Sequence, residues 1–327
     1  RNFARAEDLL GGNIALIDLQ SDTKALTKAL EWADAVINLA GENLAGIRWN
    51  AGRKKDFYDS RVGVTRLMSE QIATCTDPPE VFISASAVGI YGDRGAEWLD
   101  ENSSMGSGYL ADLCKKWEEA ARYSAARGTR VVTLRLGVVV GREGGILRKL
   151  MQSFGLGLGS YVGHGDQKVP WIHLYDVIRA VEFCLTTDHI RGAINVTSPR
   201  PSTSKEFALE LAKVAGVRAV IPIPGFALRI VFGEGAQVLT ASQNAAPWKL
   251  MDSGFEFIYE SLQDALEEEL HPETVEVKRL KSRGNQKSIG VPKNHKGCTD
   301  LLIYHLLILN HLLFFVLLVK EYSVLLQ

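Results

Sequence analysis

Short apolar runs alternate with longer amphipathic segments along the first part of the chain. The apolar runs cover residues 35–41, 81–84 and 130–141. Apolar residues recur at helical spacing within residues 21–33, 51–73 and 109–119. Strands that are apolar throughout fit a sheet covered on both faces, and alternation with helices is typical of a parallel sheet. The pattern therefore predicts an α/β fold with a doubly wound parallel sheet.

After residue 141 glycines become frequent and the predicted elements become shorter. The glycine-rich residues 155–165 suggest a mobile loop on the substrate side. Asp176 is expected to be the N-cap of a helix over residues 176–185. Further helices are predicted over residues 203–216, 226–232 and 261–270, with a short strand over residues 194–196.

The bulk composition bears on several classes of protein. The chain has 327 residues and a formal net charge of −1, so its overall charge does not favour nucleic acid as a partner. The cysteines Cys75, Cys114, Cys184 and Cys298 lack the paired spacing of a zinc site, and no metal site is predicted. We expect reduced thiols in a cytoplasmic protein, with an organelle stroma as the alternative.

Residues 271–327 do not continue the globular pattern. Residues 271–297 are basic and polar, and residues 301–319 are almost wholly apolar. That apolar length is close to the ~20 residues that span a bilayer, and the basic flank would then stay in the cytosol. The alternative to a membrane anchor is a non-native extension outside the fold. The first residue is Arg rather than Met, which suggests a fragment or a processed chain.

The stretch from Val81 to Glu119 is the predicted centre of a ligand site. Its strand ends in small and hydroxyl residues, a polar loop covers residues 93–108, and a helix follows. Ligands of open α/β folds bind at the carboxyl ends of parallel strands. The composition of this strand end therefore predicts a small-molecule site there.

Several motifs stand at the predicted strand ends and in the C-terminal part. They are Asn38-Leu39-Ala40-Gly41-Glu42-Asn43, Ser60-Arg61, the segment from Ser84 to Gly92, Tyr109-Leu110-Ala111 with Trp117-Glu118, Trp171-Ile172-His173, and Ile223-Pro224-Gly225-Phe226. Together they resemble the extended short-chain dehydrogenase/reductase group called the epimerase family, over residues 1–270. The resemblance implies a Rossmann-like dinucleotide-binding domain over residues 1–170, a mixed segment over 171–220 and a small α/β substrate domain over 221–270. It leaves residues 271–327 outside the fold.

The resemblance implies NADP as the cofactor. In this family the pyrophosphate lies on a Gly-rich loop between the first strand and the first helix. Arg1 matches the basic residue that faces the adenosine 2′-phosphate. The sequence begins after the loop, so we expect this chain to bind NADP weakly or not at all.

The resemblance also assigns cofactor contacts along the predicted sheet edge. They are Leu39, Ala40, Gly41, Asp56, Arg61, Ser84, Gly137 and Val138. Gly41 would leave room for the cofactor beside the backbone, whereas the simpler alternative is a glycine that ends a strand. Without the resemblance, Arg61 would be read as a solvated helix residue.

Ser86 and Tyr91 are the candidate catalytic residues, and Arg135 and His173 are the candidate substrate contacts. Extended reductases place a serine or threonine at the position of Ser86, where its hydroxyl bonds the reacting oxygen, and a tyrosine near the substrate at the position of Tyr91. Packing beside the cofactor is the alternative for both. Arg135 either faces an anionic substrate or is a surface charge. His173 either touches substrate or is a core histidine with satisfied hydrogen bonds.

The predicted helix that starts at Tyr109 lacks the acid/base pair of typical reductases. Those enzymes carry a tyrosine and, four residues later, a lysine that lowers the phenol pKa. Leu110 and Cys114 stand at these positions, while Tyr109 and Lys115 are each displaced by one residue. Two functions stay open. One is an NADP-dependent oxidoreductase or epimerase-like enzyme for a small molecule, with a nucleotide-sugar as a candidate, and the other is a catalytically silent NADP-binding regulatory or scaffold protein.

Overall fold

A five-stranded sheet forms the centre of the computed structural model, which describes residues 17, 19, 22–45, 47–142, 144–154, 157–272 and 316–319. The strand order is β13-β1-β2-β4-β9. The parallel members are β1 (Ala35–Asn38), β2 (Val81–Ala87), β4 (Arg130–Leu136) and β9 (Gly192–Val196). The prediction of a parallel sheet is thus confirmed.

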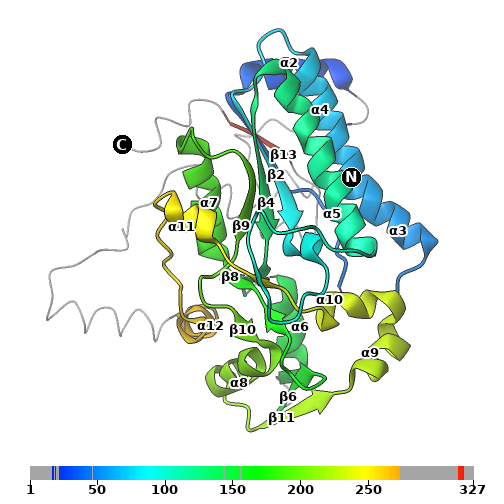
Figure 1. Cartoon of the computed structure of the whole chain (residues 1–327), viewed down its shortest axis with the longest axis vertical. Coiled ribbons are helices and arrows are strands. Elements are labelled where there is room, and N and C mark those ends of the chain that lie inside the picture. The colour runs from blue at the N-terminus through cyan, green and yellow to red at the C-terminus, as the bar shows by residue number, and fades with distance from the viewer. Residues whose placement is uncertain are drawn as a thin grey trace, which may run out of the picture.

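Helices cover both faces of this sheet (Figure 1). Helices α2 (Thr23–Trp32), α4 (Val64–Thr74) and α5 (Tyr109–Arg122) lie on one side, and α7 (Leu174–Thr186) lies on the other. Val36 and Phe82 pack in a core with α2 and α4, whereas their neighbours Ile37 and Ile83 pack in a core with α7. Alternate strand residues are therefore buried on opposite faces, which is why the strands read as continuous apolar runs.

The helix predicted over residues 51–73 is interrupted by a π-turn. It consists of α3 (Ala51–Tyr58), the π-turn Asp59–Gly63 and α4. The Asn50 side chain caps its start by accepting from the Arg53 amide at 2.8 Å. Such π-turns are rare and frequently mark functional sites. This one carries Arg61.

The strand predicted over residues 130–141 is two strands that belong to different sheets, so that prediction was wrong. β4 ends at Leu136, and β5 (Val138–Val140) pairs with β8 (Trp171–His173). The break falls at Gly137, where a Cβ atom would lie 2.1 Å from the Pro170 carbonyl oxygen. Only glycine admits this close approach of two backbone segments.

The N-cap prediction for Asp176 was also wrong. Helix α7 begins earlier, and His173 caps it by accepting from the Tyr175 amide at 3.1 Å. The Asp176 carboxylate is buried and accepts from the amides of Ile258 and Tyr259, each at 2.9 Å. Asp176 therefore anchors a distant loop to the helix.

A second core lies at the carboxyl end of the sheet, in the lower part of Figure 1. Helices α6 (Gly145–Phe154), α8 (Ser204–Ala215) and α12 (Leu262–Leu270) supply most of it. It includes residues from the ranges 1–170, 171–220 and 221–270, and the boundaries between these ranges stay a prediction. The predicted helices over 203–216 and 261–270 are confirmed, and α8 has a capping box between Thr203 and Glu206.

Residues 155–165 include a strand rather than forming one loop, which corrects that prediction. β6 (Leu158–Val162) pairs in parallel with β11 (Ala219–Ile223). Gly157 and Gly163 have φ values of +80° and +58°, so the glycines form the turns at the two ends of a strand. The remaining elements are η2 (Val88–Tyr91), β3 (Trp98–Leu99), η3 (Tyr123–Arg127), β7 (Lys168–Val169), β10 (Ser202–Thr203), α9 (Gly225–Phe232), η4 (Gly233–Ala236), α10 (Gln237–Thr240), β12 (Asn244–Ala245) and α11 (Trp248–Asp252).

The C-terminal range was expected to lie wholly outside the fold, and this expectation was wrong for one segment. β13 (Val316–Val319) pairs antiparallel with β1 and forms an edge of the central sheet. Its β-branched and apolar residues suit a strand. Most of the tail proposed as a membrane anchor lies outside the described residues. Within the part that the structure describes, no helix is both long and apolar enough to cross a bilayer.

We predict that Gly137→Ala destabilises the fold by about 1–3 kcal/mol, because the new methyl group would overlap the Pro170 carbonyl oxygen. Urea unfolding followed by circular dichroism measures the change. Gly225→Ala is the matched control, since nothing lies within 4 Å of its added Cβ, and it should change stability by less than about 0.5 kcal/mol. Equal stability of the two variants would contradict the prediction.

Candidate functional site

The predicted site residues gather near the carboxyl ends of β1, β2 and β4, and a buried ion pair lies at their centre. Glu118 of α5 accepts two hydrogen bonds from Arg135 of β4, from Nε at 2.8 Å and from Nη2 at 3.1 Å. Ser86 of β2 donates to the same carboxylate at 2.9 Å. Glu118 and Arg135 are each only 3 % exposed. This geometry joins two strands and a helix by charge-assisted hydrogen bonds.

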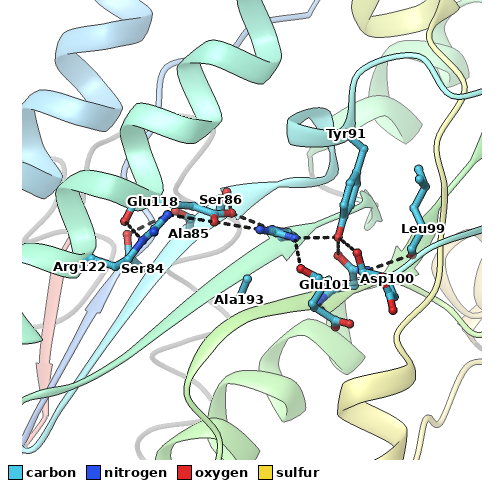
Figure 2. A network of polar contacts seen from close by, with 12 residues as sticks. Ser84, Ala85, Ser86, Tyr91, Leu99, Asp100, Glu101, Glu118, Arg122 and Ala193 are labelled. Carbon is cyan, nitrogen blue, oxygen red and sulfur yellow. Dashed lines mark hydrogen bonds and ion pairs between the residues drawn. The ribbon is translucent and has the colours of Figure 1, made fainter. Parts of the chain in front are cut away.

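The network continues from Arg135 to Tyr91 and Asn195. Figure 2 shows its two ends, with Ser86 beside Glu118 and Tyr91 beside Asp100. Arg135 Nη1 donates to Tyr91 Oη at 2.9 Å. Tyr91 Oη lies 2.7 Å from Asn195 Oδ1 and 2.9 Å from the Asp100 carbonyl oxygen, and its single proton serves one of them at a time. The backbone N–H of Asn195 donates to Glu101 Oε1 at 2.7 Å. The contacts therefore reach from α5 across the sheet to β9.

Burial and pairing set the protonation of this network. Burial raises the pKa of Tyr91 to about 12, so the phenol keeps its proton at neutral pH. Burial disfavours the charge on Arg135, but the hydrogen bonds and negative charge of Glu118 outweigh it and raise the pKa of the guanidinium. Burial also raises the pKa of Glu101 above its ordinary value.

The structure thus brings Ser86, Tyr91 and Arg135 together, as the prediction of a shared site requires. Their polar atoms are bonded to other residues of the chain, and Arg135 is not the surface charge that one alternative described. Ser84 is buried as well, and its hydroxyl donates to the Ala85 carbonyl at 3.3 Å. Contact of Ser86 or Tyr91 with a reacting group stays a prediction.

A second cation, Arg61, lies at the end of β1. Its Nη2 donates to the Glu42 carbonyl oxygen at 2.8 Å, while Nη1 is buried with no hydrogen-bond partner among the described residues. A Cβ atom on Gly41 would lie 3.1 Å from Arg61 Cζ, so the absence of a side chain there makes room for the guanidinium. Arg61 Cζ also lies 5.3 Å from the ring centroid of Trp117. Burial lowers the pKa of Arg61 to about 10, and the side chain remains charged at neutral pH.

Helix α5 presents an apolar surface where typical reductases carry their acid/base pair. A Cβ atom on Gly89 would lie 3.7 Å from Leu110 Cβ and 3.9 Å from Cys114 Sγ. Burial raises the pKa of Cys114 to about 12, so this thiol is an inert core group. The displaced Lys115 points elsewhere and donates to the Gly106 carbonyl at 2.8 Å.

The other predicted site residues have structural partners. Leu39 and Ala40 are buried, and the Ala40 amide donates to Asn38 Oδ1 at 3.1 Å. Asp56 forms an exposed ion pair with Arg53 at 3.6 Å. The last two predicted cofactor contacts, Gly137 and Val138, donate their backbone amides to other parts of the chain. Gly137 donates to the Val196 carbonyl oxygen at 3.1 Å, and Val138 donates to the Pro170 carbonyl oxygen at 2.7 Å.

His173 lies in the core, although its Nε2 has no hydrogen bond of proper geometry among the described residues, and contact with substrate stays a prediction. It is 4 % exposed, its ring stacks on Tyr259 with centroids 3.8 Å apart, and Nε2 lies 2.9 Å from Glu269 Oε1. Arg1 lies outside the described residues. Cys75, Cys114 and Cys184 are buried free thiols, as expected, and Cys298 is not among the described residues.

Glu118 and Asn195 are network residues that sequence reasoning did not assign to the site. A signal for Glu118 was present, because it stands among Cys114, Trp117 and Ala121 on the buried face of an amphipathic helix. A carboxylate in such a stripe needs a buried partner. Asn195 gave a weaker signal of the same kind, because it is a polar residue between Ile194 and Val196 in a short predicted strand.

Comparison with known families gives two matches along the chain. The model of the NAD dependent epimerase/dehydratase family matches residues 1–197, and a domain of unknown function (DUF1731) matches residues 223–269. An epimerase family protein of Mycobacterium bovis is 38 % identical over 239 residues, which are 73 % of this chain and 79 % of that protein.

Solved structures of relatives share the fold. The crystal structure of human epimerase family protein SDR39U1 (isoform 2) with NADPH has a TM-score of 0.70 and 31 % identity, and the match covers 81 % of this chain and 85 % of that one. A nucleoside-diphosphate sugar epimerase from Corynebacterium glutamicum has a TM-score of 0.62 and 27 % identity, with 86 % and 55 % covered.

We predict that Glu118→Gln destabilises the fold by roughly 3–5 kcal/mol, because it leaves the buried Arg135 charge without its counter-charge. Arg122→Ala is the matched control. Arg122 is 58 % exposed and lies 4.0 Å from the same carboxylate, so its loss should cost about 0–1 kcal/mol. Chemical denaturation of both variants measures the difference. A loss below about 1 kcal/mol for Glu118→Gln would show that the pair is not a major contributor.

We also predict that Tyr91 makes stability fall at high pH. The phenol ionises near pH 12 in the folded chain and near pH 10 when unfolded, so the stability it contributes is present below about pH 10 and is lost toward pH 12. The loss is up to about 2–3 kcal/mol. The difference in unfolding free energy between the unmodified chain and Tyr91→Phe should therefore shrink between about pH 9 and pH 12. A difference independent of pH would contradict this.

Proposed function

The chain belongs to the NAD dependent epimerase/dehydratase family, and we propose that it is an NADP-dependent oxidoreductase or epimerase-like enzyme acting on a small molecule. The observation that carries the proposal is the Arg61 site at the end of β1, with its buried and unpaired guanidinium nitrogen. NADPH in the human relative supports the choice of cofactor. A nucleotide-sugar is the substrate class we favour, on the strength of the Corynebacterium relative.

The residues at this edge suit a dinucleotide. Arg61 offers a positive charge and an N–H group without an acceptor among the described residues, and Gly41 leaves room for its guanidinium beside the end of β1. When bound, NADP accepts or donates the hydride, which is chemistry that side chains cannot supply. The buried network beside the edge holds Ser86 and Tyr91 in fixed orientations, and burial keeps the phenol protonated.

A catalytically silent NADP-binding protein is the second candidate. Leu110 and Cys114 favour it, because neither transfers a proton at neutral pH in this environment. The internal hydrogen bonds of Ser86 and Tyr91 favour it too, since a group that acts on substrate must release such partners. The two candidates share the cofactor and differ in turnover.

The discriminating experiment uses an N-terminally extended chain that carries a Gly-rich loop, the element that holds the pyrophosphate in dinucleotide-binding folds. It is incubated with NADPH or NADP and a metabolite pool, and absorbance at the nicotinamide band is followed. We predict turnover that falls about 100-fold or more in Ser86→Ala or Tyr91→Phe.

Two controls make the result specific. Tyr123→Phe changes an exposed tyrosine and should leave turnover unchanged. Circular dichroism establishes that each buried variant is folded. Tight NADPH binding without turnover would favour the silent protein, and absence of NADPH binding would contradict both candidates.

A further inference from the structure

We propose that the outer edge of β1 is a strand-binding surface, and that Val316–Val319, its occupant in this structure, competes there with the strand that carries the Gly-rich loop of a dinucleotide site. The inference rests on the proposed function, because the competition decides whether the N-terminally extended chain can bind NADP. It makes β13 an autoinhibitory strand in addition to its place in the fold.

The burial and sequence of β1 are the first observation. Each of its four residues is no more than 1 % exposed, and the strand pairs with β2 on its inner side. Its sequence, Ala35-Val36-Ile37-Asn38, carries neither a charge nor a proline, which are features that keep an edge strand from pairing with another segment. The buried N–H and C=O groups on its outer side need partners. β1 therefore has the character of an interior strand, whose outer edge accepts a further strand.

The order of the strands is the second observation. The parallel strands follow one another in sequence order from β1 to β9, and β13 lies beyond β1 as the antiparallel member of the sheet. In a doubly wound dinucleotide fold the strand order reverses beside the strand that carries the Gly-rich loop, and the dinucleotide binds across the crevice at that point. No reversal occurs between β1 and β9, so the position for a Gly-rich strand is the outer side of β1. In this structure β13 occupies that position.

The direction of β13 is the third observation. Its first residue, Val316, is opposite Asn38 at the carboxyl end of β1, and its last residue, Val319, is opposite Ala35. A pyrophosphate site needs the reverse arrangement, a parallel strand that ends beside Asn38 and leads through glycines into the N-terminus of a helix. Neighbouring strands lie about 4.7–4.9 Å apart, so one edge pairs with only one strand at a time. β13 and a Gly-rich strand therefore exclude each other.

The test measures NADPH binding by titration calorimetry on the N-terminally extended chain, which carries both strands. Leu317→Pro combined with Leu318→Pro removes two backbone donors from β13 and should free the edge of β1. The NADPH affinity should then rise about tenfold or more, because the apparent affinity is reduced by the fraction of chains whose edge is occupied by β13. Leu317→Val combined with Leu318→Val is the matched control. Valine keeps the backbone donors and favours strands, so the affinity should not change.

Hydrogen exchange followed by mass spectrometry gives a second readout, on the extended chain without substitutions. Addition of NADPH should remove the protection of the amides of residues 316–319, while the amides of β9 stay protected. Equal NADPH affinity of the proline and valine variants would overturn the inference, and so would protection of residues 316–319 that NADPH leaves unchanged. Absence of NADPH binding in every variant would instead contradict the proposed function, and the competition would fall with it.

Discussion

The buried contact between Glu118 and Arg135 is the constraint on which the centre of the molecule depends. Each charge was removed from water, and the cost is offset only if every polar atom finds a partner. Ser86, Tyr91 and the Glu101 carbonyl provide these partners. The result is a polar connection between a helix and two neighbouring strands inside an otherwise apolar core. It fixes the relative positions of β2, β4 and α5, and so the shape of the sheet edge.

The same contacts that give the site a well-defined shape also occupy the hydroxyl groups that would have to act on a substrate. The family resemblance predicts catalytic roles for Ser86 and Tyr91, but each already has a partner within the chain. A hydroxyl bonded to a carboxylate is well oriented and, for the same reason, not free. The network therefore acts first as a rigid support, which any precise ligand site requires.

Much of the fold could be predicted from the sequence because its signals are local. The apolar runs at β1, β2 and β4, and the cap at Thr203 with Glu206, depend on residues close together in the chain. The failures occurred where distant segments meet. The sequence around Gly137 is typical of one continuous strand, and the break there is caused by the close approach of Pro170. Asp176 is a suitable N-cap residue, but its carboxylate instead accepts from the amide of Tyr259, far along the chain. The pairing of Val316–Val319 with β1 is non-local in the same way.

The location of Arg61 follows from backbone geometry more than from its residue type. Each residue of an α-helix turns by about 100°. If regular α-helix replaced the π-turn, the side chains of α4 would be rotated by about that angle relative to the side chains of α3. Phe57 before the turn and Met68 after it are both buried in the described core, so both segments have fixed faces. The extra residue must then be accommodated between them, where Arg61 stands. The site thus depends on a π-turn that is held in place by the packing of the helical segments on either side.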